Sequence, residues 1–320
     1  MPAEFTLRGL RVFVALAEAG SLGVAAARLG ISLSGLSQHV TALEQAVGAR
    51  LFDRRARPVT LTPAGQALRG HARRILSVVS EAQADLAEFH LSSLPRLNLA
   101  IIDDLDASVT PVIVAALQGR YPRCFVHAVS GRSDQVIDRL VAREADIGVT
   151  AMDPPGDGFR SLPLLRESFV LVAARGVLDG VADVRGGLEA LPFVPYSPDI
   201  PIGRKVARHL SRVRLAVESR LAFEATRSVL AMVVQARGWT ITTPLNLLDA
   251  QQFLDQVDVR ALPFAGETRT VALVARAGEL GHLPDDLARD CRALVRDVLV
   301  PRFDALAPAL AGAIVVQDED

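Results

Sequence analysis

The spacing of apolar residues along this chain of 320 residues changes near residue 92. Between Leu7 and Phe89 the apolar positions recur every three or four residues, which is the period of an α-helix. Beyond Pro95, short apolar runs alternate with helical stretches. The pattern predicts a mainly helical N-terminal part, followed by a larger part in which strands alternate with helices.

Three short helices are expected near the N-terminus. Gly20 ends the first of them, and Ser21 is a candidate cap for the second, which Gly30 ends. Ser32 caps a third helix that runs to about Val47. Two short helices that meet at a tight turn form a helix-turn-helix, and the second and third helices fit that motif.

The third helix has two unlike faces. Its apolar stripe consists of Leu36, Val40, Leu43 and Val47, and its opposite face carries Ser34, Ser37, Gln38, Thr41 and Gln45. Amphipathic helices often only cover a domain surface with a solvated face. Short polar side chains are equally suited to base edges and phosphates in the major groove of DNA. The neighbouring sequence favours the second interpretation.

An arginine-rich segment follows the third helix. The stretch RLFDRRARPVTLT contains a turn at Pro58 and the residues Arg50, Arg54, Arg55 and Arg57. This pattern indicates a two-stranded wing with a basic tip, and arginines there can neutralise phosphates. Residues 1–75 carry ten arginines and four acidic residues, whereas the remaining residues carry 25 basic and 32 acidic ones. A basic head on an acidic body favours an anionic partner, and double-stranded DNA is the expected one.

The motifs at residues 7–65 resemble those of LysR-type transcriptional regulators. The matching elements, in order, are Gly20-Ser21, Ala25-Ala26, Leu29, Ser37, Leu43-Glu44, Gly48, Leu51-Phe52, Arg54 and Leu61-Thr62-Pro63-Ala64-Gly65. Leu33 departs from the pattern, because the family commonly has a polar residue, often Gln, at the start of its recognition helix. The predicted DNA contacts are therefore Ser21, Ser34, Ser37, Gln38, Thr41, Arg54, Arg55 and Arg57.

A long helix is predicted from Pro63, which Thr62 caps, to about residue 90. Its apolar residues are spaced alternately by four and three positions: Leu68, Ala72, Ile75, Val79, Ala82, Leu86 and Phe89. Such a seam is typical of a helix that pairs with another along its length, and a helix packed only on its own domain is the alternative. The resemblance implies pairing, with the family's linker helix joining two protomers into a dimer and, in the full assembly, a tetramer.

The region after Pro95 is predicted to be an α/β domain with largely parallel sheets. The expected strands lie in LNLAII, CFVHAV, ADIGVTA, FVLVAA, PFVPY, RLAVES, WTITT, VDVRAL and TVALVA, with helices between them. The resemblance implies the family's two-lobed effector-binding domain, similar to periplasmic solute-binding proteins. It also implies that strands near 169–174 and 270–275 cross between the lobes.

The chain as a whole is expected to be of the α/β class. The predicted parts are a winged helix-turn-helix at 1–62, a linker helix at 63–92, a two-lobed effector-binding domain at 93–302, and a disordered tail at 303–320.

Ligands of α/β domains sit beyond the carboxyl ends of strands, close to helix N-termini. The polar residues expected there, and therefore predicted to bind an effector, are Asp103, Asp104, Ser130, Ser133, Thr150, Ser197, Asp199, Thr226 and Thr243. Hydroxyl residues at helix starts are also common as simple caps. Their convergence on one site follows from the resemblance, not from their spacing.

Three acids, Asp103, Asp104 and Asp106, stand at the start of one predicted helix. In the family this loop commonly offers Ser or Thr to the effector near the position of Asp104. Carboxylates there would repel an anionic ligand group, although solvated acids at a helix start can also simply complement the helix dipole. If they face the ligand, they favour an effector that presents an amine, a quaternary ammonium or several hydroxyls, and we expect a zwitterionic or amine-bearing one.

The sequence contains no Gly-rich phosphate loop, HExxH, GxSxG or CxxC motif. We therefore expect no catalytic site, no cofactor and no metal. Two cysteines, Cys124 and Cys291, exclude a disulfide framework and suit a reducing compartment. With no signal peptide and no apolar run long enough to cross a membrane, the protein is expected to be cytoplasmic and to have no membrane partner.

Two functions fit these observations. The first is a transcriptional regulator of the LysR type whose promoter binding responds to a small-molecule effector. The second is an architectural DNA-binding protein whose C-terminal domain only oligomerises. A metabolic enzyme with an appended DNA-binding head is disfavoured, because the sequence shows no catalytic constellation.

Overall fold

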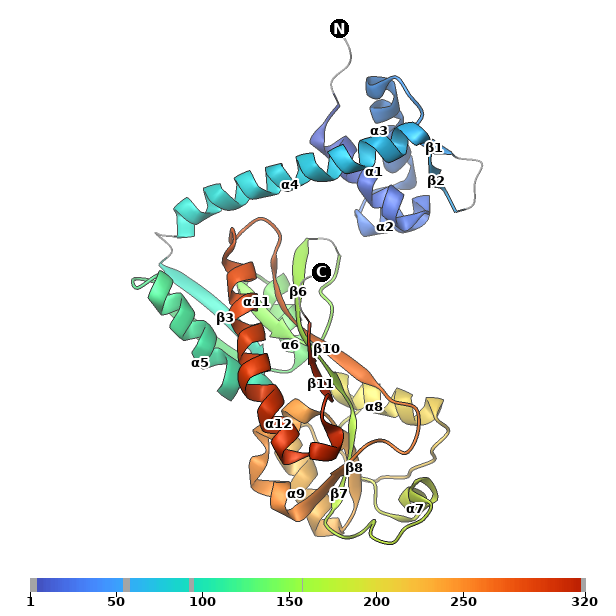
Figure 1. Cartoon of the computed structure of the whole chain (residues 1–320), viewed down its shortest axis with the longest axis vertical. Coiled ribbons are helices and arrows are strands. Elements are labelled where there is room, and N and C mark those ends of the chain that lie inside the picture. The colour runs from blue at the N-terminus through green and yellow to red at the C-terminus, as the bar shows by residue number, and fades with distance from the viewer. Residues whose placement is uncertain (1–4, 54–57, 92–94, 157, 318–320) are drawn as a thin grey trace. The chain divides into compact units, whose positions relative to one another are not determined.

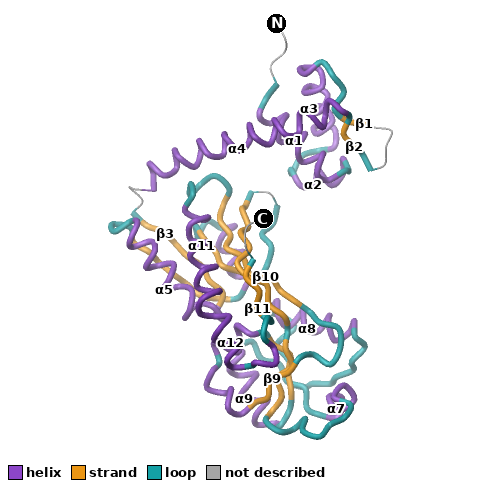
Figure 2. Tube along the Cα trace, viewed as in Figure 1, coloured by secondary structure: helices purple, strands orange, loops and turns teal. Residues whose placement is uncertain are grey.

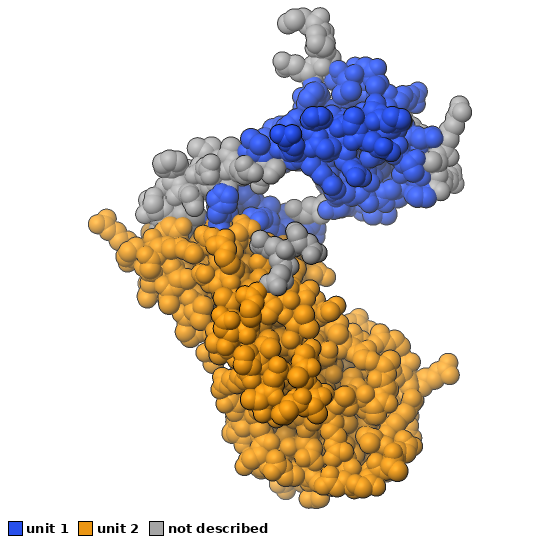
Figure 3. Space-filling model, in the orientation of Figure 1, with its two compact units in different colours: residues 1–92, 155–160, 276–282 blue, residues 93–154, 161–275, 283–320 orange. Residues whose placement is uncertain are grey.

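A computed structural model describes residues 5–53, 58–91, 95–156 and 158–317. The chain divides into two compact units (Figure 3). One unit consists of residues 1–92, 155–160 and 276–282, and the other contains the remaining residues. Within the described residues, no helix has both the length and the apolar character needed to cross a membrane.

The N-terminal unit contains three short helices, labelled in Figure 1: α1 (Leu7–Ala19), α2 (Leu22–Arg28) and α3 (Leu33–Val47). The ends of α1 and α3 confirm the expected signals, whereas the Ser21 hydroxyl makes no capping hydrogen bond at the start of α2. The backbone N–H of Gly35 donates to the Ser32 hydroxyl, which caps α3. Gly20 and Gly48 end α1 and α3 in the left-handed conformation, with φ of 60° and 71°. The helices form where local chemistry predicts them.

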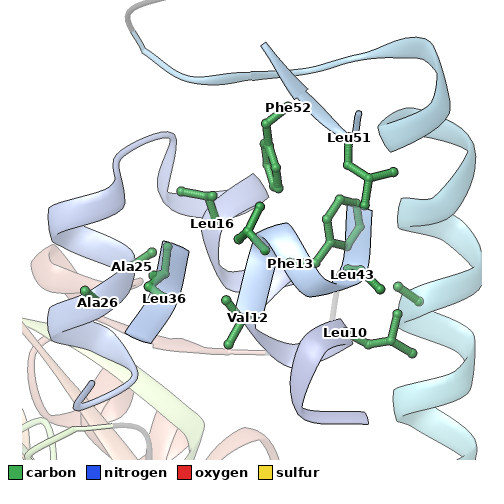
Figure 4. Close-up of a cluster of buried hydrophobic side chains, with 12 residues drawn as sticks. Leu10, Val12, Phe13, Leu16, Ala25, Ala26, Leu36, Leu43, Leu51 and Phe52 are labelled. Atoms are coloured by element: carbon green, nitrogen blue, oxygen red, sulfur yellow. The ribbon is translucent and has the colours of Figure 1, made fainter. Parts of the chain in front are cut away.

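One apolar core holds these helices together (Figure 4). Phe13 of α1 and Phe52 after α3 pack with ring centroids 5.3 Å apart. Ala25 and Ala26 of α2 are buried, and their small side chains allow the helices to approach closely. Of the predicted stripe on α3, Leu36, Val40 and Leu43 are buried, but Val47 remains exposed at the end of the helix.

The predicted wing consists of β1 (Phe52–Asp53) and β2 (Thr60–Leu61), which pair antiparallel. Its tip, residues 54–57, lies outside the described residues. The Glu44 carboxylate of α3 accepts the backbone N–H groups of Leu51 and Phe52 at 2.8 and 3.3 Å. This carboxylate therefore fixes the wing to α3.

Helix α4 (Pro63–Leu91) follows the wing and begins at Thr62, whose hydroxyl accepts from the Gly65 N–H. Ala72 is fully buried in the N-terminal core, and Leu68 and Ile75 pack against it. The expectation that the whole seam faces a second protomer is therefore wrong for these three residues, because the first turns of α4 cover α1 of the same unit. The remaining seam residues, apart from Val79, are Ala82, Leu86 and Phe89, and their side chains lie outside those described.

The C-terminal unit is built on two sheets, drawn as orange strands in Figure 2. The first has the order β11-β6-β10-β5-β3-β4, with strands β3 (Arg96–Ile102), β4 (Phe125–Gly131), β5 (Ile147–Thr150), β6 (Phe159–Ser168), β10 (Thr268–Arg276) and β11 (Ile314–Val316). The second has the order β8-β7-β9, with strands β7 (Val170–Ala174), β8 (Trp239–Thr242) and β9 (Val257–Arg260). The two-lobed α/β domain is confirmed.

The strand directions differ from the expectation of largely parallel sheets. Strand β3 is parallel to β4 and β5, but β10 is antiparallel to β5. Both pairs of the second sheet are antiparallel. A strand that enters a lobe from the other one runs against the strands it joins, which explains the mixture.

Both crossings between the lobes lie at the predicted segments. Strand β6 ends at Ser168 and β7 begins at Val170, so the first crossing lies at Phe169. The second crossing lies between β9 and β10, directly before TVALVA, and the Phe169 N–H donates to the Glu267 backbone oxygen at 2.8 Å. PFVPY and RLAVES form no named strand; Phe193 makes only an isolated bridge to Trp239.

Helices cover these sheets. They are α5 (Asp103–Arg120), α6 (Ser133–Val141), α7 (Val184–Ala190), α8 (Pro201–Arg212), α9 (Thr226–Ala236), α10 (Pro244–Asp249), α11 (Leu283–Leu294) and α12 (Val300–Leu306).

The expectation of a disordered tail is wrong for residues 303–317. Phe303 of α12 is fully buried, and β11 pairs antiparallel with β6, with Ile314 opposite Glu167. The acidic end of the sequence suggested disorder, but the apolar residues before it have a place in the core and in the sheet. Residues 318–320 lie outside the described part of the chain.

Two glycines of α4 give a paired test of the N-terminal packing. A Cβ on Gly65 would lie 2.2 Å from the backbone oxygen of Leu51, whereas one on Gly70 would meet nothing within 4 Å. We expect Gly65→Ala to destabilise the N-terminal unit by about 1–3 kcal/mol, because the wing must shift. Gly70→Ala should be neutral or stabilise the helix by up to about 1 kcal/mol. Thermal unfolding of both variants checks this, and equal Tm values for the two would contradict it.

Candidate effector-binding site and DNA-binding surface

A cavity of about 760 Å³ lies in the C-terminal unit, where β3 and β4 end. Residues of both lobes line it, including α5 and α6 of the first lobe and α8 and α9 of the second. Five of the nine predicted effector residues are among them: Asp103, Asp104, Ser130, Ser133 and Thr226. This cavity is the candidate effector-binding site.

The other four predicted residues do not line this cavity. Thr150 is fully buried, and its hydroxyl donates to the Ser133 backbone oxygen at 3.2 Å. The Ser197 hydroxyl accepts from the Asp199 N–H at 3.2 Å, so this pair forms a local turn. Thr243 is fully buried, and its hydroxyl accepts a hydrogen bond from Arg269.

The pairing of β3 with β4 brings Asp103 beside Ser130. Ile102 lies opposite Gly131 in the parallel register, so the residues that follow each strand meet at one edge. Burial raises the pKa of Asp103; a hydrogen bond from Ser130 opposes this shift, and the neighbouring carboxylate of Asp104 adds to it. Asp103 thus has a partly desolvated carboxylate whose charged neighbours include Asp104 and Asp106.

Asp104 has a different environment, which the sequence did not predict. Its carboxylate forms an ion pair with Arg269 of β10, which also donates to Glu167 at the end of β6 at 2.6 Å. The side chains of Arg269, Asp104 and Glu167 are only 10%, 8% and 0% exposed. We call these three residues the buried charge cluster.

The attraction between the Arg269 guanidinium and the two carboxylates stabilises the buried charge cluster. Burial raises the pKa of Glu167, and the nearby Arg269 guanidinium opposes that shift. For Arg269, burial lowers the pKa, but the attraction of Asp104 and Glu167 outweighs burial and raises it overall. Glu167 also accepts the backbone N–H of Leu245, at the start of α10, at 3.0 Å. The cluster therefore joins α5, β6, β10 and α10.

Hydrogen bonds continue from the cluster along the cavity wall. The Thr243 hydroxyl accepts from Arg269 at 3.0 Å and from the Asn246 amide at 3.1 Å. Asn246 in turn accepts from Thr226 at 2.8 Å, and the Tyr196 hydroxyl donates to Thr226 at 3.0 Å. Burial raises the pKa of Tyr196 to about 12, so its hydroxyl stays protonated. This series of hydrogen bonds connects Tyr196 of the second lobe to Arg269 of the buried charge cluster.

Both lobes contribute charges of both signs to the cavity, and several of these are paired: Arg132 with Glu224 at 3.3 Å and Arg227 with Asp249 at 3.0 Å. Arg204, Lys205 and Arg208 line it from α8. Arg204 lies 3.8 Å from Asp134 and Lys205 lies 3.6 Å from Glu267, whereas Arg208 has no ion pair within the described part of the chain. Asp103, Asp106 and Asp153 line the first-lobe side, and the described residues include no ion-pair partner for them.

Sequence reasoning missed Arg269, Glu167, Lys205 and Tyr196. Arg269 and Glu167 each stand at one end of a strongly apolar run, TVALVA and FVLVAA. A charged residue at the border of a buried strand is a signal of a possible buried pair. The partner could not be read from the sequence, because the contact spans 102 positions.

The predicted DNA-binding residues of α3 lie on its solvent side. Ser34, Gln38 and Thr41 are exposed and Ser37 is partly exposed. Ser21 stands at the N-cap position of α2, but its hydroxyl makes no capping hydrogen bond. Arg54, Arg55 and Arg57 fall outside the described residues.

Residues 7–66 match the family model described as the bacterial regulatory helix-turn-helix protein, lysR family, and residues 92–299 match the LysR substrate binding domain. The chain belongs to the LysR family. It is a DNA-binding transcriptional regulator with an effector-binding domain, and the family is one of regulators rather than enzymes.

Related LysR-type proteins include a probable hydrogen peroxide-inducible genes activator of Mycobacterium xenopi. It is 34% identical over 171 residues, which cover 53% of this chain and 90% of the relative. An uncharacterized HTH-type transcriptional regulator of Mycobacterium bovis is 26% identical over 309 residues, covering 90% of this chain and 98% of the relative.

Solved structures of LysR regulators share the fold. A hydrogen peroxide-bound cysteine mutant of OxyR from Corynebacterium glutamicum is similar over 97% of both chains, with 22% identity and a TM-score of 0.55. Full-length BenM is similar over 92% of this chain and 97% of the BenM chain, with 19% identity and a TM-score of 0.53.

The buried charge cluster predicts a pH-dependent defect. Arg269→Met leaves the Asp104 and Glu167 carboxylates buried without their cation, which should cost about 3–5 kcal/mol of unfolding free energy at pH 7. Burial already raises the pKa of Glu167, and without the opposing attraction of Arg269 this pKa rises further above that of the unfolded chain, so the folded variant binds a proton more tightly. Its deficit relative to the wild-type LysR regulator should shrink as the pH falls towards 5.

Urea unfolding at pH 7 and pH 5 measures both effects. The control is Arg289→Met, which removes an exposed pair with Asp286 and should cost less than about 1 kcal/mol. A deficit for Arg269→Met that is the same at both pH values would contradict the cluster as described.

Proposed function

We propose that this LysR regulator reads DNA through the exposed face of α3 and responds to a zwitterionic or amine-bearing effector in the cavity. The effector class rests on lining charges that have no ion-pair partner within the described part of the chain: Asp103 and Asp106 on the first lobe and Arg208 on the second. The two parts of the proposal rest on different units of the chain, so each has its own test.

The DNA-reading part rests on the chemistry of α3. Its outer face offers the short polar side chains of Ser34, Gln38 and Thr41, while its inner face is used by the core. The phosphate contacts would come from Ser21 at the start of α2 and from Arg54, Arg55 and Arg57. Because its target is DNA, we propose that the protein acts in the cytoplasm.

We also propose a dimer at the DNA and a tetramer in the full assembly. Because the first turns of α4 pack on their own unit, we propose that the two protomers pair through the C-terminal half of the α4 seam. Two protomers held by α4 would present two copies of α3 to a two-fold operator.

The effector part rests on the cavity charges that have no ion pair within the described part of the chain. An ammonium group would be attracted to Asp103 and Asp106, and a carboxylate to Arg208. Asp104 is not part of this assignment, because Arg269 already neutralises it. A zwitterion such as an amino acid or betaine satisfies both walls at once.

The architectural alternative requires no ligand. A cavity of about 760 Å³ between the lobes, lined by charges of both signs, favours the ligand-responsive function. Binding to the native state must raise the unfolding temperature, so ligand-dependent stabilisation separates the two functions.

Peroxide sensing, the role named for some relatives, is not favoured here. The reactive form of a cysteine is the thiolate. Burial raises the pKa of Cys291 to about 12 and also raises that of Cys124. We therefore assign the response to the cavity and not to a thiol.

For DNA reading, we expect Gln38→Ala and Thr41→Ala each to relax base preference at particular operator positions by about 1–3 kcal/mol, because base-edge contacts are lost. Arg55→Ala should instead weaken binding to all sequences and reduce its salt dependence, because a phosphate contact is lost. Footprinting on mutated operators measures both effects. An unchanged sequence preference in both α3 variants would remove α3 as the recognition element.

For the effector, thermal-shift screening should find stabilisation by amino acids or betaines in preference to dicarboxylates. Asp103→Asn should weaken the ligand found in this way by about 1–3 kcal/mol, because a charged hydrogen-bond partner is lost. Asp138→Asn, an exposed acid of α6 outside the cavity, is the matched control and should leave affinity unchanged. Stabilisation by dicarboxylates alone, with tighter binding to Asp103→Asn, would overturn the effector class.

A further inference from the structure

Leu33 is a large apolar residue that the core does not use. It is the first residue of α3, and 56% of its surface is exposed. The apolar residues that pack against the N-terminal core do not include it. Single exposed leucines are common on protein surfaces, so exposure alone assigns no role. Its position on the recognition helix is what makes it informative.

The start of α3 is the part of a helix-turn-helix that meets base edges. In such motifs the N-terminal residues of the second helix contact the bases in the major groove. Leu33 lies one turn before Ser37, and its sequence neighbours Ser32, Ser34 and Gly35 are all small. The leucine side chain is therefore the bulkiest group at this end of the helix.

The chemistry of the side chain selects its target. Leucine can neither donate nor accept a hydrogen bond, so it cannot read the polar pattern of a base edge. The thymine C5-methyl group is the apolar feature of the major groove. We propose that Leu33 is a specificity-determining residue that packs against a thymine methyl group in each half of the operator. This inference rests on the proposed role of α3.

The expected effect is modest and specific. Removing one methyl group from the contact exposes about one methyl of apolar surface, which corresponds to a roughly three- to fivefold loss of affinity for each half-site. The loss should occur at one thymine of the half-site and not at the others.

The test replaces thymidine by 2′-deoxyuridine, which removes only the C5-methyl group. A preferred duplex is first selected from random DNA with the full-length protein, and each thymine of a half-site is then replaced in turn. Wild-type protein should lose three- to fivefold in affinity at one position. Leu33→Ala should bind the thymine and uracil duplexes equally at that position, because the partner of the methyl group is gone.

Val47→Ala is the matched control, since it shortens an exposed apolar side chain at the far end of the same helix. It should retain the wild-type sensitivity to uracil. The inference is overturned if the selected half-site has no thymine, if wild-type protein is insensitive to every replacement, or if wild-type and Leu33→Ala lose affinity equally. If Gln38→Ala still relaxes base preference in those cases, only the role of Leu33 fails, and α3 remains the recognition helix.

Discussion

The buried guanidinium of Arg269 holds together the parts of the effector-binding domain that form its cavity. It lies on β10, which returns the chain to the first lobe, and it binds one carboxylate from α5 and one from the end of β6. Through Thr243 it also contacts the start of α10. Charges removed from water are stable only when paired, so the separation of these elements has a high energetic cost. The walls of the cavity take their positions from this constraint.

Asp103, Asp104 and Asp106 look equivalent in the sequence, but they have different partners in the structure. Asp104 forms an ion pair with Arg269 and stabilises the fold. Asp103 lines the cavity and forms a hydrogen bond with Ser130. Asp106 accepts a hydrogen bond from Thr110 one turn further along α5 at 2.6 Å. Adjacent positions on a helix face directions about 100° apart, so neighbouring acids can have different partners.

The sequence predicted best the features that depend on local chemistry. The caps at Ser32 and Gly48 and the start of α4 at Thr62 follow from interactions within a few residues. The strands of the second lobe were harder to predict from the sequence. PFVPY and RLAVES have strand-like composition, but neither belongs to a named strand. The cavity was predicted in part: the ends of β3 and β4 were found, but the Arg269 contacts were not. Pairing over 102 positions depends on the tertiary fold and leaves only a weak trace in the sequence.

The short strand β11 has a consequence for how the isolated domain would behave. Its residues Ile314–Val316 pair with β6 and so occupy backbone groups that would otherwise be open at the border of the six-stranded sheet. An uncovered strand of this kind is a template on which other chains can stack and aggregate. A polypeptide cut at residue 302, the predicted end of the effector-binding domain, would expose β6 in this way. Strand β11 thus protects the edge of the sheet from pairing with other chains.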